Sequence, residues 1–395
     1  MKAFLFIVFL LYLILLEISR VYFIMPFPGS QRTETIELAY WLHSNISWMR
    51  LIGWLLAGVL LFQLVRTPRK GVRMLSVSGL LLYAITFYFF NFRMLADKMF
   101  LQPTEKLFAN STNNKIPENK LVIGLTLNGI SKAYPIQLIG YHHQVRDTVG
   151  TTPVMVTYCT VCRTGRVFSP FVKGQPEQFR LVGMDHFNAM FEDSKTGSWW
   201  RQATGEAIIG PLKGSSLEEI PSQQTSLAAW IDANPSTQIM QFDPSFIKDY
   251  EDLEAFDIGT IKSSLEKRDS ASWRFKSWVI GIHTKQQSKA YDWNELVQRG
   301  YIQDSLPDLP LLILLEKDTA SFHVFNRMQG SQSLHFSWNA TTRELRDVQT
   351  GSLWDLKGEC TEGPLSGMAL QRIQAYQEFW HSWQTFHPDT KKYPE

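Results

Sequence analysis

Three long apolar runs lie in the first quarter of the chain. They cover residues 4–16 (extending to about 25), 51–65 and 74–92, and the second and third contain no charged residue. Runs near twenty residues suit helices that cross the hydrocarbon core, where the backbone must satisfy its own hydrogen bonds. We therefore expect about three transmembrane helices within residues 1–93. The first is predicted to be an uncleaved anchor rather than a signal peptide, because no small-residue cleavage pattern follows it.

The loop between the second and third apolar runs predicts their orientation. Residues 66–73 read RTPRKGVR, with four positive charges and no negative ones. Loops rich in Lys and Arg stay in the cytoplasm. We therefore expect a cytoplasmic N-terminus and export of everything after about residue 93. In a bacterium, this places the protein in the inner (cytoplasmic) membrane with a large periplasmic or extracellular C-terminal domain.

Beyond residue 93 the pattern changes to short, mostly β segments. Residues 121–125 and 154–158 are β-branched or aromatic runs bounded by Gly, Pro or Asn, and Gly-Pro pairs at 210–211 and 363–364 mark turns. Short helices are predicted at residues 135–141, 225–234, 292–299 and 370–386. The predicted fold class is α+β, mostly β, following N-terminal transmembrane helices.

The exported part matches itself along its length. Val122-Ile123-Gly124 corresponds to Val279-Ile280-Gly281, and the TGSWW segment at 196–200 corresponds to TGSLW at 350–354. The correspondences keep their order and need only small deletions, which indicates two tandem pseudo-repeats. The predicted organisation is a membrane region at 1–93, a first repeat at 94–241, a linker at 242–277 and a second repeat at 278–395.

The overall composition excludes one class of partner. The formal net charge is +2 and charged residues make up 19% of the chain. A nucleic-acid-binding protein would normally concentrate basic residues on one face. We expect the lipid bilayer as a partner and no nucleic acid.

A family resemblance rests on several segments of the first repeat. KAYP at 132–135, Asp147, VTYCTVC at 156–162, TGSWW at 196–200 and GEAIIGPL at 205–212 together resemble the bacterial domain of unknown function 3179 family. The family usually has Pro-Leu between its two cysteines, where this chain has Thr160-Val161. It often has Asn, Gly or Ser after the second cysteine, where this chain has Arg163. The resemblance implies an exported or membrane-tethered bacterial protein with a CxxC site.

The cysteines give the strongest indication of chemistry. Cys159 and Cys162 form a CxxC motif directly after a predicted strand, whereas Glu316 and Thr319 occupy the matching positions of the second repeat. One repeat therefore folds without these cysteines. A pair retained in only one half points to a site in that half. The third cysteine, Cys360, is predicted to be a buried small residue, or to complete a metal site if the halves meet closely.

The first interpretation of the pair is a metal site. Two thiolates favour Cu(I), with Zn(II) less favoured because it needs further ligands. We expect copper handling or sensing in the cell envelope, with a metal-donor protein as a possible partner. The predicted ligands are Cys159, Cys162, His142, His143, Met184 and His186.

Two other interpretations use the same cysteine pair, and a third does not involve the cysteines. In a thiol–disulfide oxidoreductase, Cys159 and Cys162 would be catalytic, would act with a redox partner protein, and would suit an oxidising compartment. A closed disulfide could also act as a staple, although so short a loop gains little stability. A third class is a non-catalytic binding module that uses a cleft between the two repeats.

Overall fold

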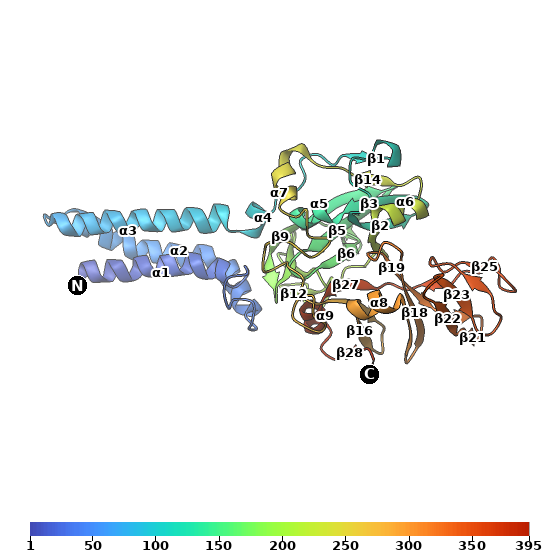
Figure 1. The fold of residues 1–395 in the computed structure, drawn as a ribbon. Helices are drawn as coiled ribbons and strands as arrows, with labels where there is room; N and C mark the ends of the chain where they lie inside the picture. The colour runs from blue at the N-terminus through green and yellow to red at the C-terminus, as the bar shows by residue number, and fades with distance from the viewer. Residues whose placement is uncertain (395) are drawn as a thin grey trace. The chain divides into compact units, whose positions relative to one another are not determined.

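The computed structural model describes residues 1–394, and the chain divides into two compact units (Figure 1). Unit 1 contains residues 1–101, 174–201 and 205–216. Unit 2 contains residues 102–173 and 202–204 and continues from 217 to the end of the chain. The expected repeat boundaries follow sequence similarity rather than these units, so that part of the first repeat belongs to unit 1.

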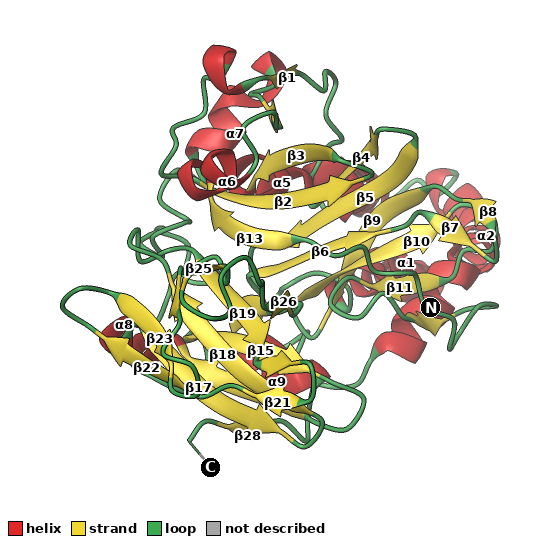
Figure 2. Ribbon diagram, turned by 90° about the vertical axis from the view of Figure 1, so that its right-hand side faces the viewer, coloured by secondary structure: helices red, strands yellow, loops and turns green. Residues whose placement is uncertain are grey.

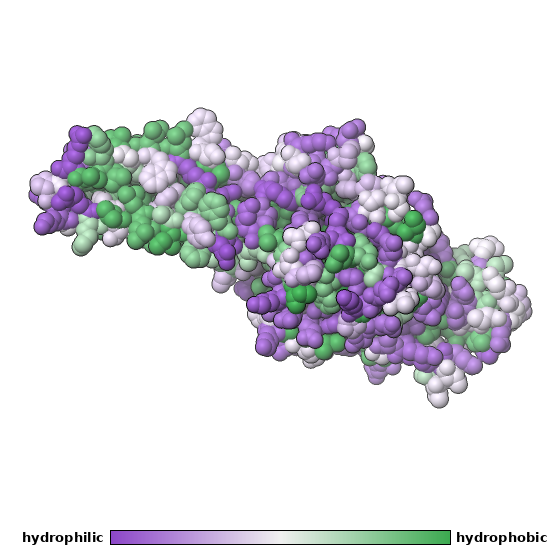
Figure 3. Space-filling view, turned by 90° about the horizontal axis from the view of Figure 1, so that it is seen from above, coloured by the Kyte–Doolittle hydropathy of each residue, from purple (hydrophilic) through white to green (hydrophobic). Residues whose placement is uncertain are grey.

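The N-terminal segments of unit 1 are helical, as the apolar runs predict. The helices are α1 (Lys2–Tyr22), α2 (Ile36–Val65), α3 (Lys70–Tyr88), a π-helical turn (Phe89–Arg93) and α4 (Ala96–Met99). Residues 2–22, 36–65 and 70–93 are each long and apolar enough to cross a membrane. Hydrophobic side chains cover much of their outer surface in Figure 3. Three candidate membrane helices are thus confirmed.

A polar network joins these three helices. The Glu17 side chain has no exposed surface. It accepts hydrogen bonds from Arg50 (Nε, 2.8 Å), Tyr83 (Oη, 3.0 Å) and Asn91 (Nδ2, 2.9 Å). A carboxylate among apolar helices is costly unless it is paired. The network therefore favours one arrangement of α1 against α2 and α3.

The remaining part of unit 1 is a four-stranded sheet with strand order β12-β11-β10-β9. Its strands are β9 (Phe179–Asp185), β10 (Asn188–Asp193), β11 (Trp199–Arg201) and β12 (Ala207–Ile209). The Met184 backbone N–H donates to the Ile24 carbonyl at 2.7 Å. Next to this bond, a Cβ at Gly183 would lie 2.4 Å from that carbonyl oxygen. Only glycine permits the approach.

The first half of unit 2 contains a five-stranded and a three-stranded sheet, with strand orders β1-β14-β3-β2-β13 and β4-β5-β6 (Figure 2). The elements are β1 (Phe108–Ala109), β2 (Leu121–Leu127), β3 (Ile130–Pro135), α5 (Ile136–His142), β4 (Gln144–Val149), β5 (Thr152–Cys159), β6 (Thr164–Phe168), β13 (Gln223–Ser226), α6 (Leu227–Ala233) and β14 (Gln238–Met240). Apolar residues of these elements form one buried core that includes Val122, Tyr134 and Val156. The linker adds a short helix, α7 (Ile247–Glu251).

The second half of unit 2 has the same order of pairing. Its elements are β15 (Trp278–His283), β16 (Ser288–Asp292), α8 (Trp293–Arg299), β17 (Tyr301–Leu306), β18 (Leu309–Leu315), β19 (Phe322–Asn326), β20 (Met328–Gln329), β21 (Gln332–Ser333), β22 (Phe336–Asn339), β23 (Glu344–Asp347), β24 (Leu353–Trp354), β25 (Cys360–Glu362), β26 (Gln371–Arg372), β27 (Tyr376–Phe379), α9 (Trp380–Phe386) and β28 (Lys391–Lys392). The order β28-β16-β15-β27 parallels β14-β3-β2-β13, and both β28 and β14 pair in parallel with their neighbour. The duplication itself stays an inference from the sequence.

One predicted helix is shorter than expected. Residues 370–386 were predicted as a single helix, but α9 covers only Trp380–Phe386. Residues 376–379 instead form β27, which pairs antiparallel with β15. The pairing supplies backbone hydrogen bonds that a helix could not give to the β15 edge. Tertiary pairing overrides the local pattern here.

Candidate functional site

The CxxC motif forms the turn of a β-hairpin. Cys159 ends β5 and pairs with Thr164, the first residue of β6. Within the turn, the Arg163 N–H donates to the Thr160 carbonyl at 3.3 Å, and Arg163 has φ +56°. This left-handed conformation suits Asn or Gly better than Arg. It gives a physical reason for the residue types that the resembling family uses after its second cysteine.

Contacts of the Arg163 side chain with β27 and β15 hold the residue in this conformation. The guanidinium Nε donates to Gln377 Oε1 at 2.9 Å, and the guanidinium carbon Cζ lies 3.8 Å from the centre of a Trp278 ring. The side chain is buried, with 1% exposed. A buried cation must be paired or stacked in this way to offset its lost hydration. The structure therefore uses Arg163 to hold the cysteine turn against β27 and β15.

Both cysteine side chains are fully buried thiols, with no exposed surface. Burial raises the pKa of the Cys162 thiol well above its usual value, and a hydrogen bond with Cys159 raises this pKa further. The charge of Lys276 and a hydrogen bond with Ser382 act in the opposite direction and lower it. The two sulfurs therefore interact directly, and a cation lies close enough to stabilise a thiolate.

Lys276 and His381 complete this environment. Lys276 Nζ donates to the Val161 carbonyl, within the CxxC turn, and lies 3.1 Å from His381 Nε2. Burial lowers the pKa of Lys276 to about 8, against the opposing charges of Cys162 and Cys159. Burial also lowers the pKa of His381 to about 3. His381 Nε2 also lies 3.2 Å from the Val161 carbonyl. A neutral imidazole accepts from the Lys276 ammonium when its proton is on Nδ1, and donates to this carbonyl when its proton is on Nε2.

The second half of unit 2 holds the turn in place. The Phe379 N–H donates to the Cys162 carbonyl at 3.0 Å, and Thr164 Oγ1 lies 3.2 Å from Ser382 Oγ. We call the side chains gathered here the dithiol site. They are Cys159, Cys162, Lys276, His381 and Ser382.

A corresponding junction exists elsewhere in unit 2. There the hairpin turn of β18 and β19 meets the start of α6, and the Ser226 N–H donates to Ser321 Oγ at 2.8 Å. In the internal alignment the residues that correspond to Lys276, His381 and Ser382 are Asn119, Ala228 and Ala229. Cysteines, lysine and histidine thus occur together at only one of the two junctions. This favours a function over a requirement of the fold.

The histidines predicted as metal ligands have other contacts. His142 Nε2 lies 2.7 Å from Tyr250 Oη, and His143 Nδ1 lies 3.1 Å from the Tyr141 carbonyl. Both side chains are buried. Burial lowers the pKa of His143 to about 4.

The other predicted ligands lie elsewhere in the chain. Met184 and His186 belong to unit 1, where His186 Nδ1 contacts Asp185 Oδ1 at 2.7 Å. Cys360 lies in β25, within a separate apolar cluster. Across residues 1–394, no three His, Cys, Asp or Glu side chains are grouped so as to hold a metal ion. The two cysteine sulfurs are therefore the donor set that the dithiol site offers.

Sequence reasoning missed Lys276, His381 and Ser382. Lys276 lies in the linker and the other two lie on α9, more than 100 residues from the cysteines. The internal alignment carried a usable signal, because all three differ in type from their counterparts in the first half.

A family model described as "Protein of unknown function (DUF3179)" matches residues 103–390. No curated protein and no solved structure matches the chain.

Proposed function

The chain belongs to the DUF3179 family, and we propose that its Cys159–Cys162 pair is a redox couple that cycles between dithiol and disulfide. The protein would then be a membrane-anchored thiol–disulfide oxidoreductase. The observation that carries this proposal is the position of Lys276, whose Nζ binds the CxxC turn and contacts His381.

Proton transfer distinguishes a redox site from a passive one. Closing a disulfide releases two protons, and opening it takes two up, whereas a staple transfers none. Lys276, with a pKa of about 8, can gain or lose a proton near neutral pH. Its charge also stabilises the thiolate, which is the nucleophile in exchange. The site therefore contains both a thiolate partner and a proton carrier.

The exchange balances with a partner disulfide as the oxidant. One thiolate of the pair attacks a sulfur of the partner disulfide, which forms a mixed disulfide and releases the partner's first thiolate. The second cysteine then attacks its neighbour, forms the Cys159–Cys162 bond and releases the partner's second thiolate. Two electrons pass to the partner, and the two protons from the cysteines go to the released thiolates. Because both side chains are buried, exchange with another protein requires the turn to move.

Copper binding is a second candidate that the same sulfurs support. Cu(I) accepts two thiolate ligands, and the hydrogen bond between Cys162 and Cys159 shows that the side chains meet. Lys276 would offset the negative charge of a two-thiolate complex. The sulfurs would hold the ion, and the protein would act in copper handling or sensing. Tetrahedral Zn(II) fits less well, since it needs two further ligands.

A redox titration separates the two candidates. The full-length protein is equilibrated in detergent with thiol–disulfide buffers, denatured in acid, alkylated and analysed by peptide mass spectrometry. We expect Cys159 and Cys162 to be oxidised together, with a midpoint within the roughly −270 to −120 mV range of redox-active pairs, while Cys360 stays reduced as an internal control.

The copper candidate has a separate measurement. A chelator competition with Cu(I) is run on the wild type and on Cys159→Ser. Two cysteines that stay reduced throughout the titration would overturn the redox proposal. Stoichiometric copper that is lost in Cys159→Ser would then support copper handling.

The role of Lys276 is tested by a substitution. Lys276→Met removes the cation and should raise the pKa of Cys162. This slows disulfide formation by about three- to fourfold for each pKa unit, because the more basic thiolate is also the stronger nucleophile. Lys276→Arg keeps the charge and should react more nearly like the wild type. Lys267→Met, at an exposed position of the same linker, is the matched control. Equal rates in Lys276→Met and the wild type would remove Lys276 from the proposal.

The proposed location is consistent with redox work. The basic loop at residues 66–73 favours a cytoplasmic position for the α2–α3 connection, which sends unit 2 to the outer side of a bacterial inner membrane. Disulfides persist in that oxidising compartment. A redox partner protein or a metal donor would meet the dithiol site there.

A further inference from the structure

Unit 2 contains a cavity whose lining includes neither cysteine. Its volume is about 460 Å³. The walls come from β2, β13 and α6 of the first half, and from β19 and residues 372–375 of the second half. Volumes of roughly 300–1,000 Å³ are typical of small-molecule sites. The cavity is large enough for a ligand of that size.

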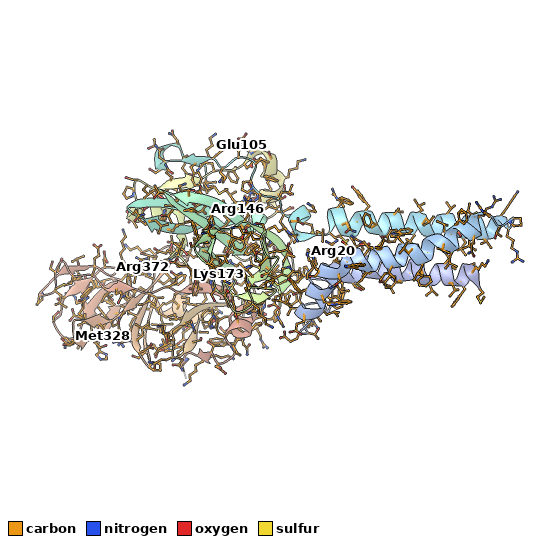
Figure 4. All side chains as sticks on the ribbon, turned by 180° about the vertical axis from the view of Figure 1, so that it is seen from behind. Arg20, Glu105, Arg146, Lys173, Met328 and Arg372 are labelled. Atoms are coloured by element: carbon orange, nitrogen blue, oxygen red, sulfur yellow. The ribbon has the colours of Figure 1, made fainter. Side chains whose placement is uncertain are left out.

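One wall of the cavity carries an oriented cation. Arg372, labelled in Figure 4, is an exposed residue at the end of β26. Its Nη1 lies 2.9 Å from His323 Nδ1. The described residues form no ion pair with this guanidinium, so most of its N–H groups remain available to a ligand.

His323 and Glu316 hold Arg372 in position. His323 Nε2 lies 2.7 Å from Glu316 Oε1, and Gln223 Nε2 lies 3.1 Å from His323 Nδ1. Burial lowers the pKa of His323, so the imidazole is neutral at pH 7. With its single proton donated to Glu316, Nδ1 is left to accept from Arg372 and Gln223. Glu316 is the residue that aligns with Cys159, so the two hairpin turns carry different chemistry.

The other walls define the rest of the ligand. Trp230, Phe322 and Val324 line the cavity with apolar surface and are almost fully buried. The Gln374 side-chain oxygen accepts from the Ser222 N–H at 3.2 Å, which leaves its amide N–H₂ as a donor. Arg372 and Gln374 thus place two donors two residues apart on one segment, and Trp230 of α6 adds an apolar ring to the lining. An Arg fork matches a carboxylate, which can accept two parallel hydrogen bonds.

We propose that this cavity binds a small organic carboxylate with an apolar or aromatic body, and that Arg372 is its charged anchor. The carboxylate bonds to the guanidinium and the Gln374 amide, while the apolar body packs against Trp230 and Phe322. This site does not depend on the redox proposal, because it uses different residues and a different chemistry.

Binding of matched probes tests the proposal. The full-length protein in nanodiscs is titrated with 3-phenylpropionate and hexanoate, and with the corresponding neutral amides, by isothermal calorimetry. We expect saturable binding of at least one carboxylate with a Kd of about 1 mM or tighter. Its amide should bind at least about tenfold more weakly, because it lacks the charge-assisted hydrogen bonds.

Two substitutions assign the anchor. Arg372→Gln should weaken the binding of the carboxylate by about 10- to 100-fold and leave the binding of the amide nearly unchanged. Arg346→Gln, at an exposed arginine on β23, is the matched control and should bind like the wild type. The proposal fails if neither carboxylate binds, if acid and amide bind equally to the wild type, or if both substitutions weaken binding alike. The comparison of carboxylate with amide uses the wild-type protein alone. It therefore tests the proposal even if Arg372→Gln misfolds.

Discussion

Buried histidines, among them His143 and His381, make unit 2 sensitive to acid. Burial lowers the pKa of His143 to about 4 and that of His381 to about 3, whereas an unfolded histidine titrates near 6.5. Between these values the unfolded chain binds protons that the folded chain does not. The free energy of unfolding should therefore be highest above pH 6.5 and fall as the pH drops towards 4, by up to about 1.4 kcal/mol per pH unit for each histidine.

Thermal unfolding between pH 7 and pH 4, followed by tryptophan fluorescence, measures this slope. His143→Gln should make the slope shallower, because the residue no longer takes up a proton on unfolding. His335→Gln, at an exposed histidine, should leave the slope unchanged. A slope that neither substitution alters would mean that other groups cause the acid sensitivity.

The dithiol site shows which residues a sequence can reveal. Cys159 and Cys162 are recognisable because two sulfurs lie within four residues and one repeat lacks them. Lys276 and His381 join them only because β27 pairs with β15, which places α9 and the end of the linker beside the turn. A lone Lys or His carries no periodic signal. Only the alignment of the two halves, in which both differ in type from their counterparts, could have singled them out.

At the scale of elements, a close contact between a strand and a helix repeats in both halves of unit 2. A Cβ at Gly124 would lie 2.4 Å from the Trp230 ring, and one at Gly281 would lie 2.1 Å from the Trp383 ring. We expect Gly281→Ala to lower the free energy of unfolding by about 1–3 kcal/mol, since the ring must shift to admit the methyl group. Urea unfolding of the full-length protein in detergent would measure the change.

A matched glycine provides the control for this prediction. Gly71 lies in α3 with nothing within 4 Å of an added Cβ. Gly71→Ala should therefore leave the stability of unit 2 unchanged and favour the helix slightly. A Gly281→Ala protein as stable as the wild type would show that the strand and α9 are packed less tightly than the structure indicates.

Elements were predictable where a local pattern decided them. The three apolar helices and strands β2 and β5 follow from hydrophobic runs of suitable length. The error at residues 370–379 arose because β27 is an edge strand with buried Gln377 and Glu378, whose polar side chains do not alternate with apolar ones. Gln377 bonds to Arg163, and Glu378 bonds to Arg166. These partners lie far away in the sequence, so no local pattern could reveal the strand.

At the scale of the whole molecule, the order of strands was beyond the sequence. The internal matches predicted two similar halves, but they could not say that β14 and β28 would pair in parallel with β3 and β16. Nor could they show that residues 174–201 and 205–216 form one compact unit with the three apolar helices. Strands that are far apart in the sequence pair according to which sheet faces become buried. A short segment of sequence does not record this.

The proposed orientation of the chain in the membrane rests on few charges. Arg66, Arg69, Lys70 and Arg73 connect α2 to α3, and no acidic residue accompanies them. Keeping such a loop in the cytoplasm directs α3 outward. In a bacterial host, alkaline phosphatase fused after Gly71 should therefore be inactive, whereas the same enzyme fused after residue 395 should be active, because it folds only when exported. Neutralising Arg66, Arg69 and Lys70 with Gln, the basic residues that both fusions retain, should reduce the difference between the two fusions by weakening the charge bias. An active enzyme after Gly71 would place unit 2 in the cytoplasm, where reducing conditions would hold the cysteine pair as a dithiol.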